Sequence, residues 1–119
     1  MRIEVVGRNV EVTAELREHV HKRFQRVARQ VSELAELEVV LREEANPSIR
    51  EGQVAEATLH LKGTTLHAEE SAERMMTAIR ELSDDIKRQV KRHRELRRKR
   101  SQTRRLVGEM RGRGTALGG

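Results

Sequence analysis

The sequence predicts an α+β fold in which a four-stranded sheet carries two helices on one of its faces. Three observations lead to this prediction. Two segments repeat apolar residues at the spacing of a helix, four short segments alternate apolar and polar residues, and the segments follow one another in the order β-α-β-β-β-α. A two-layer sandwich buries the apolar side of every segment and leaves the second face of the sheet partly open to water.

The first part of the chain supplies the first strand and the first helix. Residues 2–6 alternate in the manner of a strand and are followed by the turn-forming residues Gly7-Arg8-Asn9. A second short extended segment over residues 10–12 leads to Thr13, a favourable N-cap, and a helix is expected over residues 14–30. The buried stripe expected for this helix consists of Leu16, Val20, Phe24, Val27 and Val31.

Three further strands are expected in the middle of the chain. Residues 37–42 have the pattern of a strand, residues 43–53 form a polar loop, and residues 54–62 show the most regular alternation in the chain. Gly63-Thr64 is expected to make a two-residue hairpin turn, after which residues 65–69 return beside the preceding strand. The side chains expected to point inward are Leu37, Val39, Leu41, Ala55, Ala57, Leu59, Leu61, Leu66 and Ala68. The small alanines among them let helices pack closely on this face.

The last predicted helix covers residues 71–100 and becomes more basic toward its end. Its apolar stripe consists of Met75, Ile79, Leu82, Ile86 and Val90. His93 and Arg97 occupy the next positions of the stripe, so the last turns should leave the core while the helix continues. Residues 101–119 are rich in Gly and Arg and have no sustained period, which favours a disordered basic tail. The sequence thus predicts one folded domain over residues 1–100 and a tail over residues 101–119.

Positive charge is concentrated in the second part of the chain. The net charge is +6, with −3 on residues 1–70 and +9 on residues 71–119. Residues 86–113 hold 13 Lys and Arg against 2 acidic residues, more than is needed to complement the dipole at the end of a helix. This density indicates a polyanionic partner. Nucleic acid is favoured over a membrane, because the exposed part of the helix has no broad apolar face that could enter lipid.

Phe24 is the one aromatic residue of the chain. Proteins that read unpaired bases on a sheet or an OB-fold stack those bases on aromatic side chains, and this chain cannot supply such a platform. A nucleic-acid partner should therefore be recognised through its shape and its phosphates.

Basic ridges on both predicted helices supply the candidate binding residues. Lys22, Arg26 and Arg29 share one flank of the first helix, and Arg23 lies between that flank and the core. The second helix carries two ridges, one of Arg80, Lys87, Lys91, Arg94 and Arg98, and one of Arg88, Arg92 and Lys99. The spacing does not show which of these two ridges faces the first helix.

Little in the sequence favours an enzyme or a metal site. The chain has no Cys, which excludes disulfides, thiolate metal sites and a cysteine nucleophile. With a Gly63-Thr64 turn, His60 and His67 would lie directly across from each other, but no third ligand has a fixed place beside them, and a surface pair is the favoured interpretation. We expect no catalytic residue, no cofactor, no metal and no small-molecule substrate. The chain also has no apolar run long enough for a bilayer and no leader segment, which makes the cytoplasm the expected compartment.

Several stretches together resemble the ribosome hibernation factors, the family of the hibernation promoting factor and the ribosome-associated inhibitor. They are the Gly7–Thr13 stretch GRNVEVT running into LREHV at residues 16–20, the stretch VAEATL at residues 54–59, and residues 75–82 followed by IKRQV at residues 86–90. The resemblance covers about residues 2–96, and the order and spacing of the stretches carry it. The chain departs from the family pattern at Arg74-Met75-Met76, where an aromatic residue is usual, and at Asp85, where a Lys is frequent.

The resemblance implies a fold related to double-stranded RNA-binding domains. It also implies docking on the small ribosomal subunit, on its 16S-type ribosomal RNA, in the channel of messenger and transfer RNA, so that translation stops in stationary or stressed cells. The positions that match the family's contacts are Arg23, Arg26 and Arg29 on the first helix and Arg88 and Arg92 on the second. The full set of RNA-binding residues expected is Lys22, Arg23, Arg26, Arg29, Arg88, Lys91 and Arg92.

The resemblance does not decide whether the protein acts on single or on dimerised ribosomes. The residues after 100 are too few for the separate C-terminal domain with which long family members pair two ribosomes. The chain therefore resembles a short form, or a core cut from a longer protein, and a role in dimerised ribosomes is left open. The alternative function is a general double-stranded RNA-binding or protein-binding regulatory module.

Overall fold

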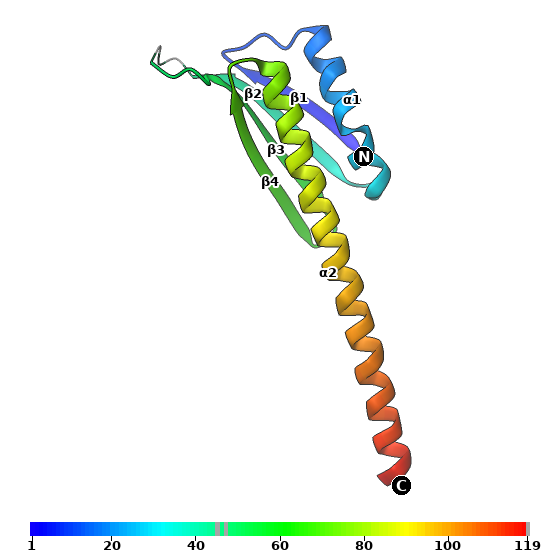
Figure 1. Cartoon of the computed structure of the whole chain (residues 1–119). Helices are drawn as coiled ribbons and strands as arrows, with labels where there is room; N and C mark the ends of the chain where they lie inside the picture. Colours follow the sequence, from blue (N-terminus) through cyan, green and yellow to red (C-terminus); the bar gives the residue numbers. More distant parts are fainter. Residues whose placement is uncertain (45, 47, 119) are drawn as a thin grey trace.

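The computed structural model describes residues 1–44, 46 and 48–118, with side chains through residue 108. Its elements are β1 (Arg2–Arg8), α1 (Ala14–Gln30), β2 (Glu36–Glu43), β3 (Gln53–Leu61), β4 (Thr64–Ala72) and α2 (Met75–Gly118) (Figure 1). This order confirms the predicted β-α-β-β-β-α fold. Two positions of the predicted loop, residues 45 and 47, and the last residue of the predicted tail, residue 119, lie outside the described residues.

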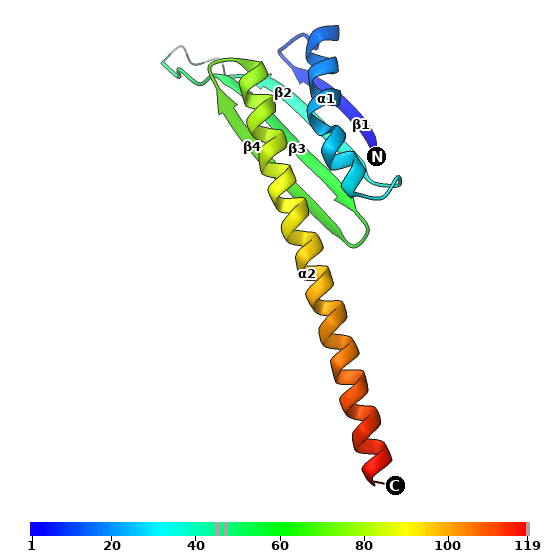
Figure 2. The same cartoon turned by 45° about the vertical axis from the view of Figure 1, so that its right-hand side comes forward.

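The four strands form one sheet in the order β1-β2-β3-β4, with both helices on the same face (Figure 2). β1 pairs with β2 in parallel, whereas the β2–β3 and β3–β4 pairs are antiparallel. The parallel pair requires a crossover connection, and α1 supplies it. Helix α2 follows directly from β4 and packs on β3, β4 and α1. The two helices therefore lie side by side, and each presents one flank to the other.

The core lies between the sheet and the two helices. On α1 the buried side chains are Val20, Phe24 and Val27, and on α2 the predicted stripe from Met75 to Val90 is buried as expected. The strands contribute Val5, Leu37, Val39, Leu41, Ala55, Ala57, Leu59 and Ala68. Phe24 is fully buried, so the one aromatic ring stabilises the core and is not available to a base.

The β3–β4 hairpin turns one residue earlier than the sequence indicated. Leu61 pairs with Thr64, so the turn consists of Lys62 and Gly63, and Gly63 has the positive φ of 79° that glycine adopts without strain. This register places His60 opposite Thr65 and His67 opposite Thr58. The expectation that His60 and His67 lie directly across from each other is therefore wrong.

Other boundaries also differ from the sequence prediction. Residues 10–12 are not a strand, and residues 71 and 72 end β4 instead of beginning α2, because buried Ala72 still pairs with Gln53. At the other end, α2 continues through residues 101–118, where a disordered tail was expected. The one proline of the chain lies before β3, and a glycine costs a helix only about 1 kcal/mol, so nothing forces a break after residue 100. The division at residue 100 into a binding domain and a tail stays a prediction.

Within the part of the chain that the structure describes, no helix is both long enough and apolar enough to span a bilayer. Helix α2 is long, at 44 residues, and extends beyond the sheet (Figure 1). Its sequence over residues 91–105 is rich in Lys and Arg.

Candidate nucleic-acid interface

A basic groove runs between the two helices. We call it the interhelical groove, and it is lined by Lys22, Arg23, Gln25, Arg26 and Arg29 of α1 and by Ser83 and Lys87 of α2. Its volume is about 370 Å³. Five of these seven residues are cationic, and none of the described residues that line the groove is acidic. The charge of its lining therefore favours an anionic partner over a cation.

The packing of the helices places these cations at the groove. Because Val20, Phe24 and Val27 point into the core, the basic residues of α1 are left on its outer and flanking sides. On α2, the facing position is Ser83, a buried polar residue whose hydroxyl donates a hydrogen bond to the Arg80 carbonyl oxygen at 2.8 Å. This small, internally satisfied side chain lets the helices approach each other without a bulky or unpaired group between them.

Lys87 is the α2 cation that the groove contains. Its Nζ lies 3.7 Å from an Asp84 carboxylate oxygen, and its side chain is about 29% exposed. Exposed ion pairs of this kind are weak, so Lys87 remains able to exchange Asp84 for a phosphate. Lys91 is exposed and lies one helical turn further along the same flank. The four predicted residues of α1 and the Lys87–Lys91 ridge of α2 thus border one surface.

The structure does not bring Arg88 and Arg92 into this groove. The charge of Arg88 lowers the pKa of the Glu70 carboxyl in β4, so Arg88 lies near Glu70. Arg88 is therefore on the flank of α2 away from α1. Arg92 follows Arg88 by one turn and is exposed. Both remain on the helical layer of the molecule, so their predicted contact with RNA stays a prediction, but they belong to a different edge from the α1 cations.

An acidic cluster accompanies Arg88 on that edge. Burial raises the pKa of the Glu70 carboxyl, and the neighbouring carboxyls of Asp85 and Glu81 raise it further, while the charge of Arg88 opposes them. Asp85 is held in place by Gln89, whose side-chain amide donates to Asp85 at 3.0 Å and to the His67 carbonyl oxygen at 2.8 Å. Asp85 therefore takes part in the contact between α2 and β4, which gives this departure from the family pattern a structural role.

The open face of the sheet carries its own ion pairs. Arg42 of β2 bonds to Glu56 of β3 at 3.2 Å and to Glu69 of β4, and its hydrogen bond with Glu69 raises the pKa of the guanidinium. Ligand atoms of Glu56, His67 and Glu69 lie within 4.8 Å of one another, close enough to hold a metal ion. The Arg42 guanidinium already pairs with both carboxylates and would compete with a cation for their oxygens.

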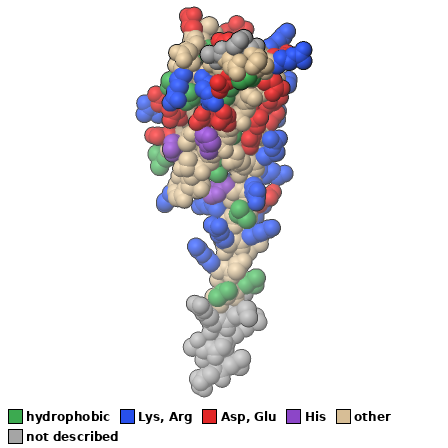
Figure 3. Space-filling model, turned by 90° about the vertical axis from the view of Figure 1, so that its left-hand side faces the viewer, with side chains coloured by type: hydrophobic (Ala, Val, Ile, Leu, Met, Phe, Trp, Pro, Cys, Tyr) green, Lys and Arg blue, Asp and Glu red, His purple; other side chains and the backbone are tan. Residues whose placement is uncertain are grey.

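The charges of the molecule are thus divided between regions. On the face that Figure 3 shows, the acidic side chains lie on the globular part, where basic side chains are also present, and basic side chains follow the projecting part of α2. A polyanion that approaches this protein is attracted by the helices and not by the open face of the sheet.

The profile of the family described as Sigma 54 modulation protein / S30EA ribosomal protein matches residues 3–98. This match covers most of the described chain, including both flanks of the interhelical groove. The chain belongs to this family. The description of the family names a ribosomal protein and a modulator of sigma 54, and it names no enzymatic activity.

Several relatives of this S30EA family are similar along most of their length. The chain is 33% identical over 95 residues to the ribosome hibernation promoting factor of Salmonella typhimurium, covering 80% of this chain and 95% of the relative. It is also 33% identical over 95 residues to the factor of the same name from Pseudomonas putida, covering 80% of this chain and 88% of the relative. These matches confirm the resemblance that the sequence motifs indicated.

Two solved structures have the same fold. The N-terminal domain of Thermus thermophilus Protein Y superimposes with a TM-score of 0.68 at 30% identity, covering 78% of this chain and 99% of that domain. A ribosomal subunit interface protein from Coxiella burnetii gives a TM-score of 0.67 at 18% identity, covering 80% and 99%, and supports the fold alone. The predicted α+β sandwich is confirmed by both.

Lys87 lies on a predicted basic ridge but is not among the binding residues expected from the sequence. The sequence shows that Lys87 and Lys91 are one turn apart on the same ridge as Arg80 and Arg94. It does not show which flank of α2 packs beside α1. That side is decided by the position of Ser83, which a helical wheel alone does not distinguish from other polar residues.

Proposed function

We propose that this protein is a ribosome hibernation factor that binds the small ribosomal subunit with its helical layer and thereby inhibits translation. The observation that carries the proposal is the interhelical groove, in which five cations from two helices border one surface of a chain of the S30EA family. The names of the relatives support a ribosomal partner. The phosphates of 16S-type ribosomal RNA are the proposed contacts.

Binding would be driven by electrostatics. Lys and Arg side chains that neutralise phosphates release the counterions condensed on the RNA, and this release supplies most of the affinity. The rigid sheet holds the two basic ridges at a fixed separation, which restricts binding to RNA whose phosphates match that separation. Because Phe24 is buried, no aromatic side chain contributes to the contact.

Inhibition would follow from occupancy of the channel of messenger and transfer RNA, without any chemical step. A protein held there prevents both RNAs from binding for as long as it stays, as stationary or stressed cells require. This role places the protein in the cytoplasm, where ribosomes are. We propose residues 1–100 as the binding unit.

Sedimentation with purified small subunits tests the proposal. The variant Arg26→Glu with Arg29→Glu reverses two exposed cations of the groove, and Arg8→Glu with Arg50→Glu reverses two exposed cations outside it. We expect the groove variant to lose co-sedimentation and the control to retain it, with native circular dichroism for both. Equal binding by the two variants would refute the groove as the site.

A general double-stranded RNA binder is the second candidate, because the cations of the interhelical groove can contact the phosphates of any RNA helix. Competition separates the two functions. A factor that occupies the channel is displaced by transfer RNA and initiation factors, whereas a general binder is titrated away by any RNA helix. Displacement by an unrelated duplex alone would favour the second candidate.

A further inference from the structure

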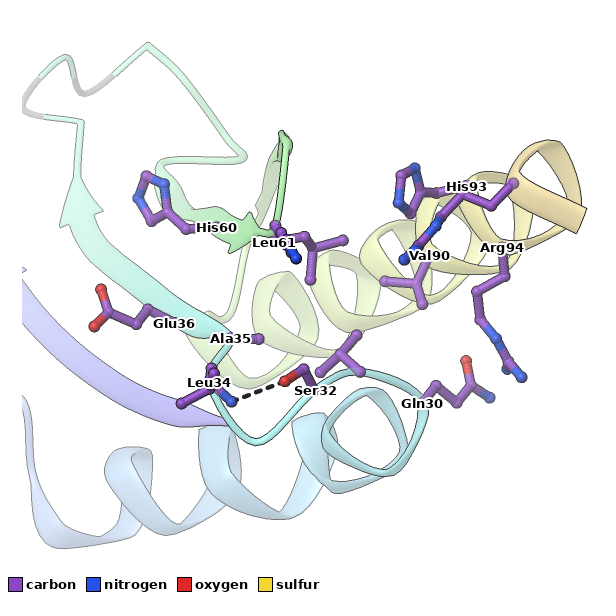
Figure 4. Close-up of a pocket in the computed structure, with 13 residues that line it drawn as sticks. Gln30, Ser32, Leu34, Ala35, Glu36, His60, Leu61, Val90, His93 and Arg94 are labelled. Carbon is purple, nitrogen blue, oxygen red and sulfur yellow. Dashed lines mark hydrogen bonds between the residues drawn. The ribbon is translucent and has the colours of Figure 1, made fainter. Parts of the chain in front are cut away.

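A second groove lies where α1 ends, the β3–β4 hairpin turns and α2 leaves the sheet (Figure 4). We call it the end groove. Its volume is about 490 Å³, and its apolar lining includes Val31, Leu61 and Val90. Leu34 stands at its border with 90% of its surface exposed. A pocket of this size fits a small organic group, since ligand sites commonly measure roughly 300–1,000 Å³.

Polar side chains occupy positions at this groove where apolar side chains would complete the core. His93 and Arg97 continue the stripe of α2 that contains buried Val90, and apolar residues there would extend the core over Leu61. The chain has an imidazole and a guanidinium instead. Arg94 also lines the groove, and Glu36 is the one acidic residue among the described residues around it. An apolar wall with a cationic border suits a ligand that has a flat apolar part and a negative charge.

The end groove lies next to the interhelical groove along both helices. Gln30 lines the end groove and lies one helical turn after Arg26, which lines the interhelical groove. On the other helix, Arg94 lies seven residues after Lys87 and therefore on the same flank of α2. A polyanionic strand bound along the interhelical groove would reach the end groove without crossing the acidic edge of the molecule.

We propose that the end groove takes one unpaired nucleotide of an RNA strand whose phosphates lie along the interhelical groove. The base would pack on the apolar wall formed by Val31 and Leu61. The guanidinium of Arg94 or Arg97 would cover its other side, since arginine planes stack on bases as aromatic rings do. A phosphate next to this base would be neutralised by Lys62, which also lines the groove. The inference rests on the proposed function in taking RNA as the partner, and it adds a base-binding site to a surface otherwise suited only to phosphates.

Amide chemical shifts of the ¹⁵N-labelled full chain test this site, with hexaadenylate as the single-stranded probe. We expect the amides of Leu34, Leu61 and His93 to shift together with those of the interhelical groove. A blunt RNA duplex should shift only the interhelical groove, because its bases are paired. Hexaadenylate shifts confined to the interhelical groove would overturn the proposal.

A matched pair of variants distinguishes the end groove from general charge. Arg97→Gln and Arg98→Gln remove the same charge from neighbouring exposed positions of α2, but only Arg97 lines the groove. Both positions lie beyond the buried stripe, so both variants keep the fold. We expect Arg97→Gln to weaken hexaadenylate binding by about tenfold, the loss typical of one charge-assisted contact, and Arg98→Gln to change it much less. Equal losses would contradict the inference.

Three further outcomes separate this inference from the proposed function. If the wild-type protein sediments with small subunits while hexaadenylate leaves the end groove unshifted, the nucleotide site is refuted and the proposed function stands. If a synthetic peptide of alternating Glu and Leu shifts the end groove and hexaadenylate does not, the groove binds protein, and the inference is also refuted. If the wild-type protein does not sediment with small subunits, the proposed function is refuted instead.

Discussion

His19 of α1 lies against the backbone of α2, with its Nε2 atom 3.2 Å from the carbonyl oxygen of Met76. Among the described residues this is the one side-chain hydrogen bond that joins the two helices. It lies near the start of both helices, whereas the basic residues of the interhelical groove lie further along them. The bond thus helps to fix the separation at which the two basic ridges are presented.

Removing this bond should lower the stability of the fold. In His19→Ala the Met76 carbonyl loses its side-chain donor, and we expect the free energy of unfolding to fall by about 1 kcal/mol, the usual net value of such a bond. Urea denaturation measures the change. His21→Ala is the matched control, because His21 is on the same helix and exposed. Equal stability of the two variants would show that the bond does not hold the helices together.

Neighbouring residues of α2 distinguish the two edges of the helical layer. Lys87 lines the interhelical groove, whereas Arg88 lies beside Glu70 on the opposite flank. We expect Lys87→Gln to weaken binding to the small subunit by roughly ten- to a hundredfold and Arg88→Gln to weaken it less, since a charge-assisted contact contributes roughly 1.5–3 kcal/mol. Filter binding with purified subunits measures both. A larger loss for Arg88→Gln would assign the contact to the edge that the family resemblance favours.

The helices and strands could be predicted because their apolar periodicity is strong. The helix from Ala14 to Gln30 has Thr13 as its N-cap, with the Leu16 amide donating to the Thr13 hydroxyl at 3.2 Å, and the prediction placed both ends correctly. The apolar stripe of α2 from Met75 to Val90 is also buried, as the sequence predicted. Local patterns of this kind decide which side of an element is buried.

The remaining features depend on contacts between elements. Whether Lys62-Gly63 or Gly63-Thr64 forms the hairpin turn is a shift of one residue, and both pairs contain a turn-forming glycine. Because of this change in register, His60 and His67 do not face each other. In the same way, the flank of α2 that meets α1 depends on how both helices pack on the sheet, so no pattern within α2 alone could select Lys87 over Arg88.

The raised pKa of Glu70 makes stability depend on pH. Because the folded state holds this proton more tightly than the unfolded chain, the fold is favoured near the model-peptide value of 4.5 and loses that contribution as the pH rises through the folded pKa. Glu70→Gln removes the charge that burial and the neighbouring carboxyls of Asp85 and Glu81 disfavour. We therefore expect this variant to be more stable than the wild type at pH 7.5, with a smaller difference at pH 4.5.

Urea denaturation at both pH values measures this difference. Glu11→Gln serves as the control, because Glu11 is exposed in the segment before α1 and distant from the acidic cluster. A Glu70→Gln variant that loses stability at pH 7.5 would mean that the charged carboxyl is held by a favourable contact.

Salt dependence of binding should report how many groove cations meet phosphates. Each neutralised phosphate contributes about −0.9 to the slope of log affinity against log salt concentration on a duplex. If the five cations of the interhelical groove all make such contacts, the slope is about −4.5, and affinity falls by roughly several hundredfold between 50 and 200 mM salt. Fluorescence anisotropy with labelled subunits gives the slope. Lys87→Gln should reduce its magnitude by about 1, while His21→Ala should leave it unchanged, since His21 lies outside the groove. A slope near zero in the wild type would exclude phosphate contacts as the source of affinity.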